Sequence, residues 1–103
     1  MPVVVVAVIT PLDGHRQNVV DAFAIVSPRV HDEAGCELYA LHHDAETVVM
    51  IERWTSADDL AAHAAGAPIG QLNALLADHV TGPSVVSVLE NVPLGDPVKG
   101  TVQ

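Results

Sequence analysis

The stretch from Gly35 to His63, GCELYALHHDAETVVMIERWTSADDLAAH, decides the fold of this chain. It has the pattern of a turn, a strand, a short hairpin, a second strand and a helix that begins after Ser56. The hairpin is too short for anything but antiparallel pairing of its strands, which we expect at residues 36–43 and 47–54. Ser56 is a typical N-cap residue, and the acidic residues after it suit the positive end of a helix dipole. This stretch therefore predicts a strand–strand–helix unit.

The segments on either side extend this unit. The continuous apolar run from Val3 to Ile9 predicts a strand that is covered on both faces. Apolar residues at helical spacing follow it, and we expect Pro28 to kink or break that helix because proline lacks an amide donor. Pro68 suits the start of a further helix, and Ser84 to Glu90 has the pattern of a fourth strand. The order βαββαβ is typical of a ferredoxin-like α+β fold, with a four-stranded antiparallel sheet and helices on one face.

The chain of 103 residues fits one domain. We expect residues 1–91 to form the ferredoxin-like domain, and residues 92–103, which are rich in Pro and Gly, to form a tail or a dimer arm. Two helical stripes can cover only one face of the sheet, whereas the first strand is apolar on both. Because a bare apolar face is an interaction surface, we expect a homodimer that packs through the open sheet face.

Charge and cysteine content exclude several classes of function. The chain has 4 basic and 13 acidic residues, for a formal net charge of -9, so its surface repels nucleic acid and anionic membranes. No apolar run is long enough to span a membrane, and no export signal is recognisable. The single Cys36 can form no internal disulfide. We therefore expect a cytoplasmic protein that binds neither nucleic acid nor membrane.

Three side chains of the central stretch can converge on one pocket. Glu52 and Trp54 lie two residues apart on a strand and so point to the same face. His63 follows Leu60 by three residues and shares the helical stripe that must face the sheet. An imidazole titrates near neutral pH, which suits His63 as a general base, although it could instead bond a neighbouring carbonyl. A buried Glu52 must be paired or protonated, and Trp54 fits a pocket wall or the core.

Tyr39 depends on the register of the hairpin. A three-residue loop at residues 44–46 would place Glu37 opposite Arg53 as an ion pair and turn Tyr39 to the face opposite Glu52. A two-residue loop would place Tyr39 opposite Glu52 instead. The Glu37–Arg53 pairing favours the first register, and both remain open.

A metal site is not favoured. His42 and His43 are adjacent on a strand, so they point to opposite faces and cannot hold one ion together. A set of His42, Glu52 and His63 would offer suitable ligands, but nothing in the sequence fixes their distances.

The combination of Gly-Cys-x-x-Tyr at residues 35–39, Glu-x-Trp at residues 52–54 and the helix His63, inside a βαββαβ chain of this length, resembles the antibiotic-biosynthesis monooxygenase family, which includes the quinol monooxygenases. The resemblance implies a dimeric α/β barrel. It also implies that the protein oxidises a small phenolic, quinol or polyketide-like aromatic substrate with molecular oxygen, without metal, flavin or haem. Carried over, it implicates His63, Glu52, Trp54 and Tyr39 in catalysis.

The expected chemistry starts with removal of a phenolic proton by His63, polarised by Glu52, from a flat substrate held against Trp54. One departure from the family is the step after the helix histidine, commonly Ser-Pro-His, which is replaced here by residues 64–69, AAGAPI. Two alternatives remain. The first is a non-catalytic dimeric ligand-binding or stress-associated protein of the same fold. The second is a haem-degrading barrel. This chain resembles those proteins less, because they carry an asparagine on the first strand and this chain does not.

Overall fold

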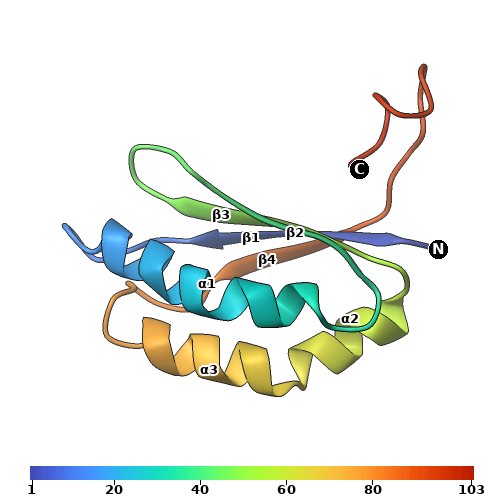
Figure 1. The fold of residues 1–103 in the computed structure, drawn as a ribbon. Helices are drawn as coiled ribbons and strands as arrows, with labels where there is room; N and C mark the ends of the chain where they lie inside the picture. The colour runs from blue at the N-terminus through green and yellow to red at the C-terminus, as the bar shows by residue number, and fades with distance from the viewer.

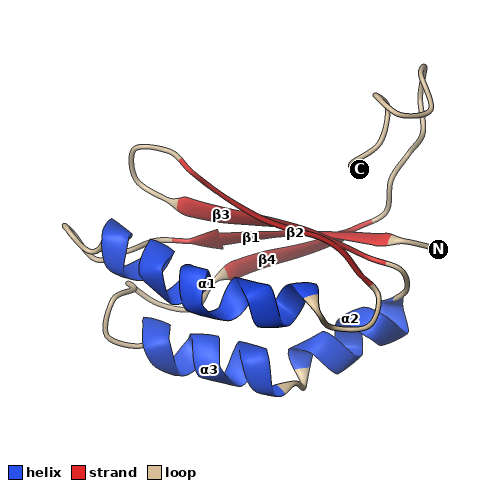
Figure 2. Cartoon of the chain, viewed as in Figure 1, coloured by secondary structure: helices blue, strands red, loops and turns tan.

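The computed structural model describes residues 1–103, and it has the predicted ferredoxin-like α+β fold (Figure 1). The second helical region is divided into two helices. The elements are β1 (Val3–Ile9), α1 (Arg16–His31), β2 (Cys36–His43), β3 (Val48–Trp54), α2 (Ala57–Ala64), α3 (Ala67–Leu76) and β4 (Val85–Leu89). The strands form one antiparallel sheet in the order β2-β3-β1-β4. All three helices lie on one face of this sheet, as Figure 2 shows.

Alternation along the two central strands builds the core. On β3 the residues Val48, Met50, Glu52 and Trp54 are buried, whereas the residues between them are only half-buried. Their partners on β1 are buried in the same way on the helix-facing side. The core also takes one face of α1 and two leucines of α3; these residues are Val19, Ala22, Phe23, Val26, Val30, Leu72 and Leu76.

The expected break at Pro28 is wrong, because α1 is one continuous helix with Pro28 inside it. Proline removes a single amide donor, and the neighbouring turns are held by packing. Val26 and Val30 on either side of it are both 0% exposed. The predicted cap at Ser56 is present, since its side chain accepts a hydrogen bond from the Asp59 amide.

The hairpin has the two-residue loop, so the favoured three-residue loop is wrong. The Asp44 amide donates to the Thr47 carbonyl at 3.0 Å, which leaves only residues 45 and 46 at the tip. Tyr39 therefore lies opposite Glu52, on the helix-facing side of the sheet.

The predicted ion pair forms all the same, because β2 carries an irregularity between Cys36 and Leu38. Cys36 pairs with Trp54 and Leu38 with Arg53, so Glu37 is the extra residue of a β-bulge. From there it accepts a hydrogen bond from Arg53 Nε at 2.6 Å. One inserted residue thus allows both the ion pair and the Tyr39–Glu52 register.

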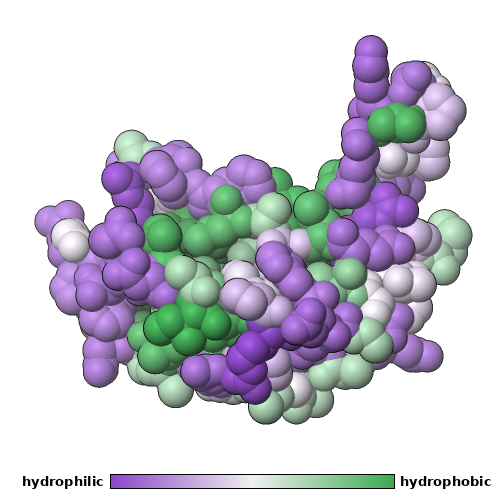
Figure 3. Space-filling model, viewed as in Figure 1, coloured by the Kyte–Doolittle hydropathy of each residue, from purple (hydrophilic) through white to green (hydrophobic).

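No helix covers the other face of the sheet, and the C-terminal segment reaches it only at one end, where Arg53 donates to the Val102 carbonyl and Val4 is 3% exposed (Figure 1). Val6, Val8 and Ile51 on that face are half-buried, and Val85 and Leu89 of β4 are 68% and 47% exposed. In Figure 3 hydrophobic side chains gather along the level of the sheet and over α3. After β4 the chain leaves the sheet as an irregular segment with exposed Val92 and Leu94. No helix is both long enough and apolar enough to cross a membrane.

Candidate active site

A mostly apolar cavity of about 380 Å³ lies between the sheet and the helices. Most of its lining side chains are hydrophobic, and the titratable ones are Tyr39, Glu52 and His63. The remaining lining residues come from three strands (β1, β3 and β4), all three helices and the turn before β4: Val5, Ala7, Ile9, Phe23, Met50, Leu60, Ala64, Ile69, Leu72, Asn73, Leu76, Pro83, Ser84 and Val86. Three of the four residues predicted from sequence therefore border one hollow.

Trp54 lies behind the cavity wall and is not a lining residue. It is 0% exposed, and its indole Nε1 donates to Glu52 Oε1 at 2.9 Å. Its ring stacks on the His63 imidazole, with centroids 4.5 Å apart and planes inclined by 29°. A molecule in the cavity would meet His63 rather than Trp54, so the indole acts as a rigid support for the imidazole and the carboxyl group.

His63 is 5% exposed, and one of its ring nitrogens is hydrogen-bonded to a carboxylate. Nδ1 lies 2.6 Å from Glu33 Oε2, and Nε2 lies 3.9 Å from Glu52 Oε1. An ionised carboxylate can only accept a hydrogen bond, which assigns the proton to Nδ1 in the neutral ring. Nε2 is then free to take a proton from a molecule in the cavity.

Glu33 is a candidate site residue that the sequence did not predict. It lies in the turn after α1, thirty positions before His63. The turn is fixed by Gly35, whose φ of +80° suits glycine, and a side chain there would collide with the Asp59 carboxylate at the start of α2. The close packing of this turn on α2 carries Glu33 to the imidazole. An acidic residue shortly before a turn glycine was the only available signal.

Tyr39 is 6% exposed and lines the cavity beside His63. Its ring stands edge-on to the imidazole, with centroids 5.8 Å apart. Burial, reinforced by the charges of Glu52 and Glu33, raises the pKa of Tyr39 well above its usual range. The phenol therefore keeps its proton, and its hydroxyl can donate a hydrogen bond to an oxygen of a bound molecule.

Glu52 is 6% exposed, and burial raises its pKa above the ordinary value. The hydrogen bond from Trp54 and the charge of His63 oppose this shift, whereas Glu33 adds to it. A carboxyl group that binds its proton more readily than in water, next to an imidazole, suits a site where protons are exchanged.

The set of His42, Glu52 and His63 does not come together. His42 is exposed and lies opposite Val49, on the sheet face away from the helices. No cluster of three or more His, Cys, Asp or Glu side chains is arranged to hold a metal ion.

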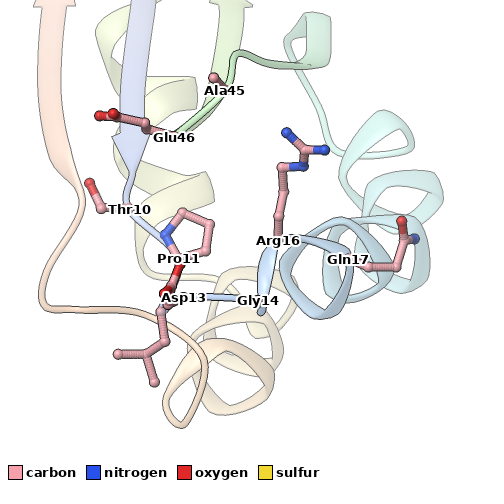
Figure 4. A pocket seen from close by; sticks show the side chains of 9 residues that line it. Thr10, Pro11, Asp13, Gly14, Arg16, Gln17, Ala45 and Glu46 are labelled. Carbon is pink, nitrogen blue, oxygen red and sulfur yellow. The ribbon is translucent and has the colours of Figure 1, made fainter.

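A second hollow, a polar cleft of about 710 Å³, lies where β1 leads into α1. Figure 4 shows Arg16 and Gln17 of α1 on one side of it, and Thr10 and Glu46 on the other. Its charged side chains are exposed, and it includes none of the predicted site residues. The buried polar groups identify the smaller, apolar cavity as the candidate active site.

Known proteins resemble this chain in both sequence and structure. The curated protein "Probable quinol monooxygenase YgiN" of Escherichia coli strain K12 is 39% identical in an alignment that covers 52% of this chain and 62% of that protein. The match thus spans less than two thirds of that relative's length. The structure of Rv0793 from Mycobacterium tuberculosis has a TM-score of 0.81 at 26% identity, covering 93% of this chain and 98% of that chain. PA3566 from Pseudomonas aeruginosa, at 23% identity with a TM-score of 0.79, covers 88% of this chain and 94% of its own, and shows the fold alone.

A family model assigns most of the chain. The model described as antibiotic biosynthesis monooxygenase matches residues 2–74. This range includes Tyr39, Glu52, Trp54 and His63, and also Glu33. The chain belongs to the antibiotic biosynthesis monooxygenase family.

Proposed function

We propose that the protein is a monooxygenase that oxidises a small phenolic, quinol or polyketide-like aromatic molecule with molecular oxygen, without metal, flavin or haem. The observation that carries the proposal is the state of His63, which is buried, fixed at Nδ1 by Glu33 and directed into an apolar cavity. The name of the Escherichia coli relative, a quinol monooxygenase, supports the substrate class. The single thiol, which can form no internal disulfide, supports a cytoplasmic location.

The proposed reaction begins with a proton transfer. His63 Nε2 takes the phenolic proton, and the resulting imidazolium is stabilised by Glu33 on its other nitrogen and by Glu52. Tyr39 donates its hydroxyl hydrogen to an oxygen of the substrate. The apolar lining excludes water, which leaves an electron-rich phenolate next to its counter-ion.

Oxygen enters in the second step. The phenolate gives one electron to molecular oxygen, and the two radicals combine at a ring carbon that bears hydrogen, forming a C–O bond. The radical pair first gives a ring peroxide anion, and the imidazolium of His63 donates the phenolic proton to it to form the hydroperoxide. His63 then takes the ring hydrogen as a proton while the O–O bond breaks, and it passes this proton to the departing hydroxide to give water. One oxygen atom thus stays in the quinone and the other leaves as water, so no external reductant is needed.

The test is oxygen consumption with a panel of hydroquinones and naphthols. We expect His63→Ala to lower kcat by about two to four orders of magnitude, as for loss of a general base. His43→Ala, an exposed hairpin residue that does not line the cavity, is the matched control and should keep full activity. Unchanged turnover in His63→Ala would eliminate the proposed base. Binding of the panel without oxygen uptake in the unaltered protein would favour the ligand-binding alternative.

We also propose that two copies pack through the open sheet face, with residues 92–103 as an arm on the partner. The apolar open face and the exposed Val92 and Leu94 support this assembly. Light scattering should give a mass near twice the 10.8 kDa of one chain. Ile51→Lys, on the open face, should give the single-chain mass, whereas Ala74→Lys on an exposed helix position should not. A single-chain mass for the unaltered protein would contradict the proposal.

A further inference from the structure

The charges around the cavity point to a restriction on what it can bind. We propose that the cavity accepts uncharged aromatic molecules of two or three fused rings and rejects those that carry a carboxylate or phosphate group. The inference rests on the proposed function in taking the bound molecule to be aromatic, and it adds the charge of the substrate.

Every ionisable side chain that can carry a fixed charge near the cavity is acidic. Glu52 lines it, and Glu33 lies directly behind His63, at 2.6 Å from the imidazole. No Lys or Arg is among the lining residues. His63 is the one lining side chain that can become cationic, and its neighbours Glu33 and Glu52 are both acidic.

The four basic residues of the chain are all placed elsewhere. Arg16 donates to the Asp44 carbonyl at the polar cleft, and Arg29 bonds the Gln71 side chain on the exposed surface. Arg53 points to the other sheet face, where it bonds Glu37 and the Val102 carbonyl. Lys99 is in the C-terminal segment. None of them is in position to neutralise an anionic group in the cavity.

An anionic substituent would therefore lose its hydration without gaining a partner. It would also be repelled by Glu52 whenever that carboxylate is ionised, in a site where water screens charges poorly. The phenolate of the proposed reaction differs, because its proton stays beside it on His63. A second anionic group on the same substrate has no such cation.

The rest of the lining suits a neutral, flat molecule. A volume of about 380 Å³ is at the lower end of the range of ligand pockets, which run from roughly 300 to 1,000 Å³. Phe23, Met50 and Leu72 supply apolar contact area. Asn73 and Ser84 are exposed lining residues, so they form the cavity's border with solvent.

Calorimetric titration with two matched probes tests the restriction. The probes are 2-naphthamide and 2-naphthoate, which have nearly the same shape and differ in charge at neutral pH. We expect the amide to bind at least about tenfold more tightly than the carboxylate. Equal affinities, or tighter binding of the carboxylate, would overturn the inference. Failure of both probes to bind would overturn it too, because the cavity would not accept two fused rings.

Two lysine variants on α3 separate a local effect from the overall negative charge. Asn73→Lys places a cation at the cavity, whereas Ala74→Lys adds the same charge at an exposed neighbour that does not line it. We expect Asn73→Lys to strengthen 2-naphthoate binding at least about tenfold and to change 2-naphthamide binding little. Ala74→Lys should leave both affinities unchanged. An equal gain in both variants would overturn the inference, because the net charge alone would then account for the selectivity.

The binding experiment is independent of turnover, so the two proposals can fail separately. Selective binding of the amide without oxygen uptake on any phenol would keep this inference and remove the proposed function. Oxidation of carboxylated and uncharged naphthols with equal kcat/KM would support the proposed function and overturn this inference.

Discussion

Two neighbouring valine-rich strands, β1 and β4, have very different surroundings. Val5 of β1 and Val88 of β4 are directly paired and point to the same side of the sheet, yet Val5 is 3% exposed and Val88 is 58% exposed. The difference is in their surroundings, because β1 lies between β3 and β4, whereas β4 is an edge strand and α1 packs on β2 and β3 in the other half of the sheet. A valine-rich strand is predicted to be buried. Whether other parts of the same chain bury it depends on where the helices lie.

The cavity is open to solvent on the β4 side of the sheet. On the covered half, Tyr39, Glu52 and Trp54 are packed and held by hydrogen bonds and ring contacts. On the other half, the lining residue Val86 of β4 is 56% exposed. The site therefore combines a rigid wall with an open side, which suits a group that must be held in place and a substrate that must enter.

The largest loss of stability is expected from a substitution on the covered half of the sheet. Trp54→Ala removes a side chain that is 0% exposed and should lower the free energy of unfolding by about 3–5 kcal/mol. It also removes the donor to Glu52 and the support of His63. Urea unfolding measures the loss, with Trp54→Phe as a control that keeps most of the packing. A loss below about 1 kcal/mol would show that this half is less tightly packed than the structure indicates.

The paired valines test the comparison itself. Val5→Ala should lower the free energy of unfolding by about 2 kcal/mol, from the lost methyl groups and the cavity left behind. Val88→Ala should cost less than about 0.5 kcal/mol if β4 stays in contact with solvent. Urea unfolding of both variants at the same protein concentration gives the difference. Equal losses would contradict the contrast between the buried and the exposed valine.

The smallest effect is the pH dependence contributed by Glu52. Burial raises the pKa of Glu52 in the folded state, so between its ordinary and its raised value the folded chain binds more protons than the unfolded chain. The free energy of unfolding therefore has a component that falls as pH rises through this interval. Glu52→Gln removes that component. Urea unfolding of both proteins from about pH 4 to pH 8 should show the stability of the unaltered protein falling relative to the variant. Parallel curves would contradict the burial effect.

The sequence predicts the fold well because periodicity and capping are local properties. The alternation along β3 and the cap at Ser56 can both be identified without knowing the rest of the chain. The face of Tyr39 could not be settled, because the bulge near Glu37 changes the register by one residue. Pro28 was misjudged because the packing of Val26 and Val30 outweighs one missing hydrogen bond.

The candidate site was predictable in part for a similar reason. Glu52, Trp54 and His63 are close in sequence on adjacent elements, so spacing alone indicates that they face one another. Glu33 reaches the same imidazole from a turn that is distant in sequence, and its position depends on the contact of Gly35 with Asp59. Such a tertiary contact leaves no periodic signal in the sequence.

The stacking of the only indole on the imidazole has an optical consequence. A protonated imidazole is an efficient quencher of the excited indole, and these two rings are 4.5 Å apart. Because Trp54 is the single tryptophan of the chain, its emission should report the ionisation of one histidine without a label. Stopped-flow mixing with a phenol should therefore change the emission of Trp54 if His63 takes the proton as proposed.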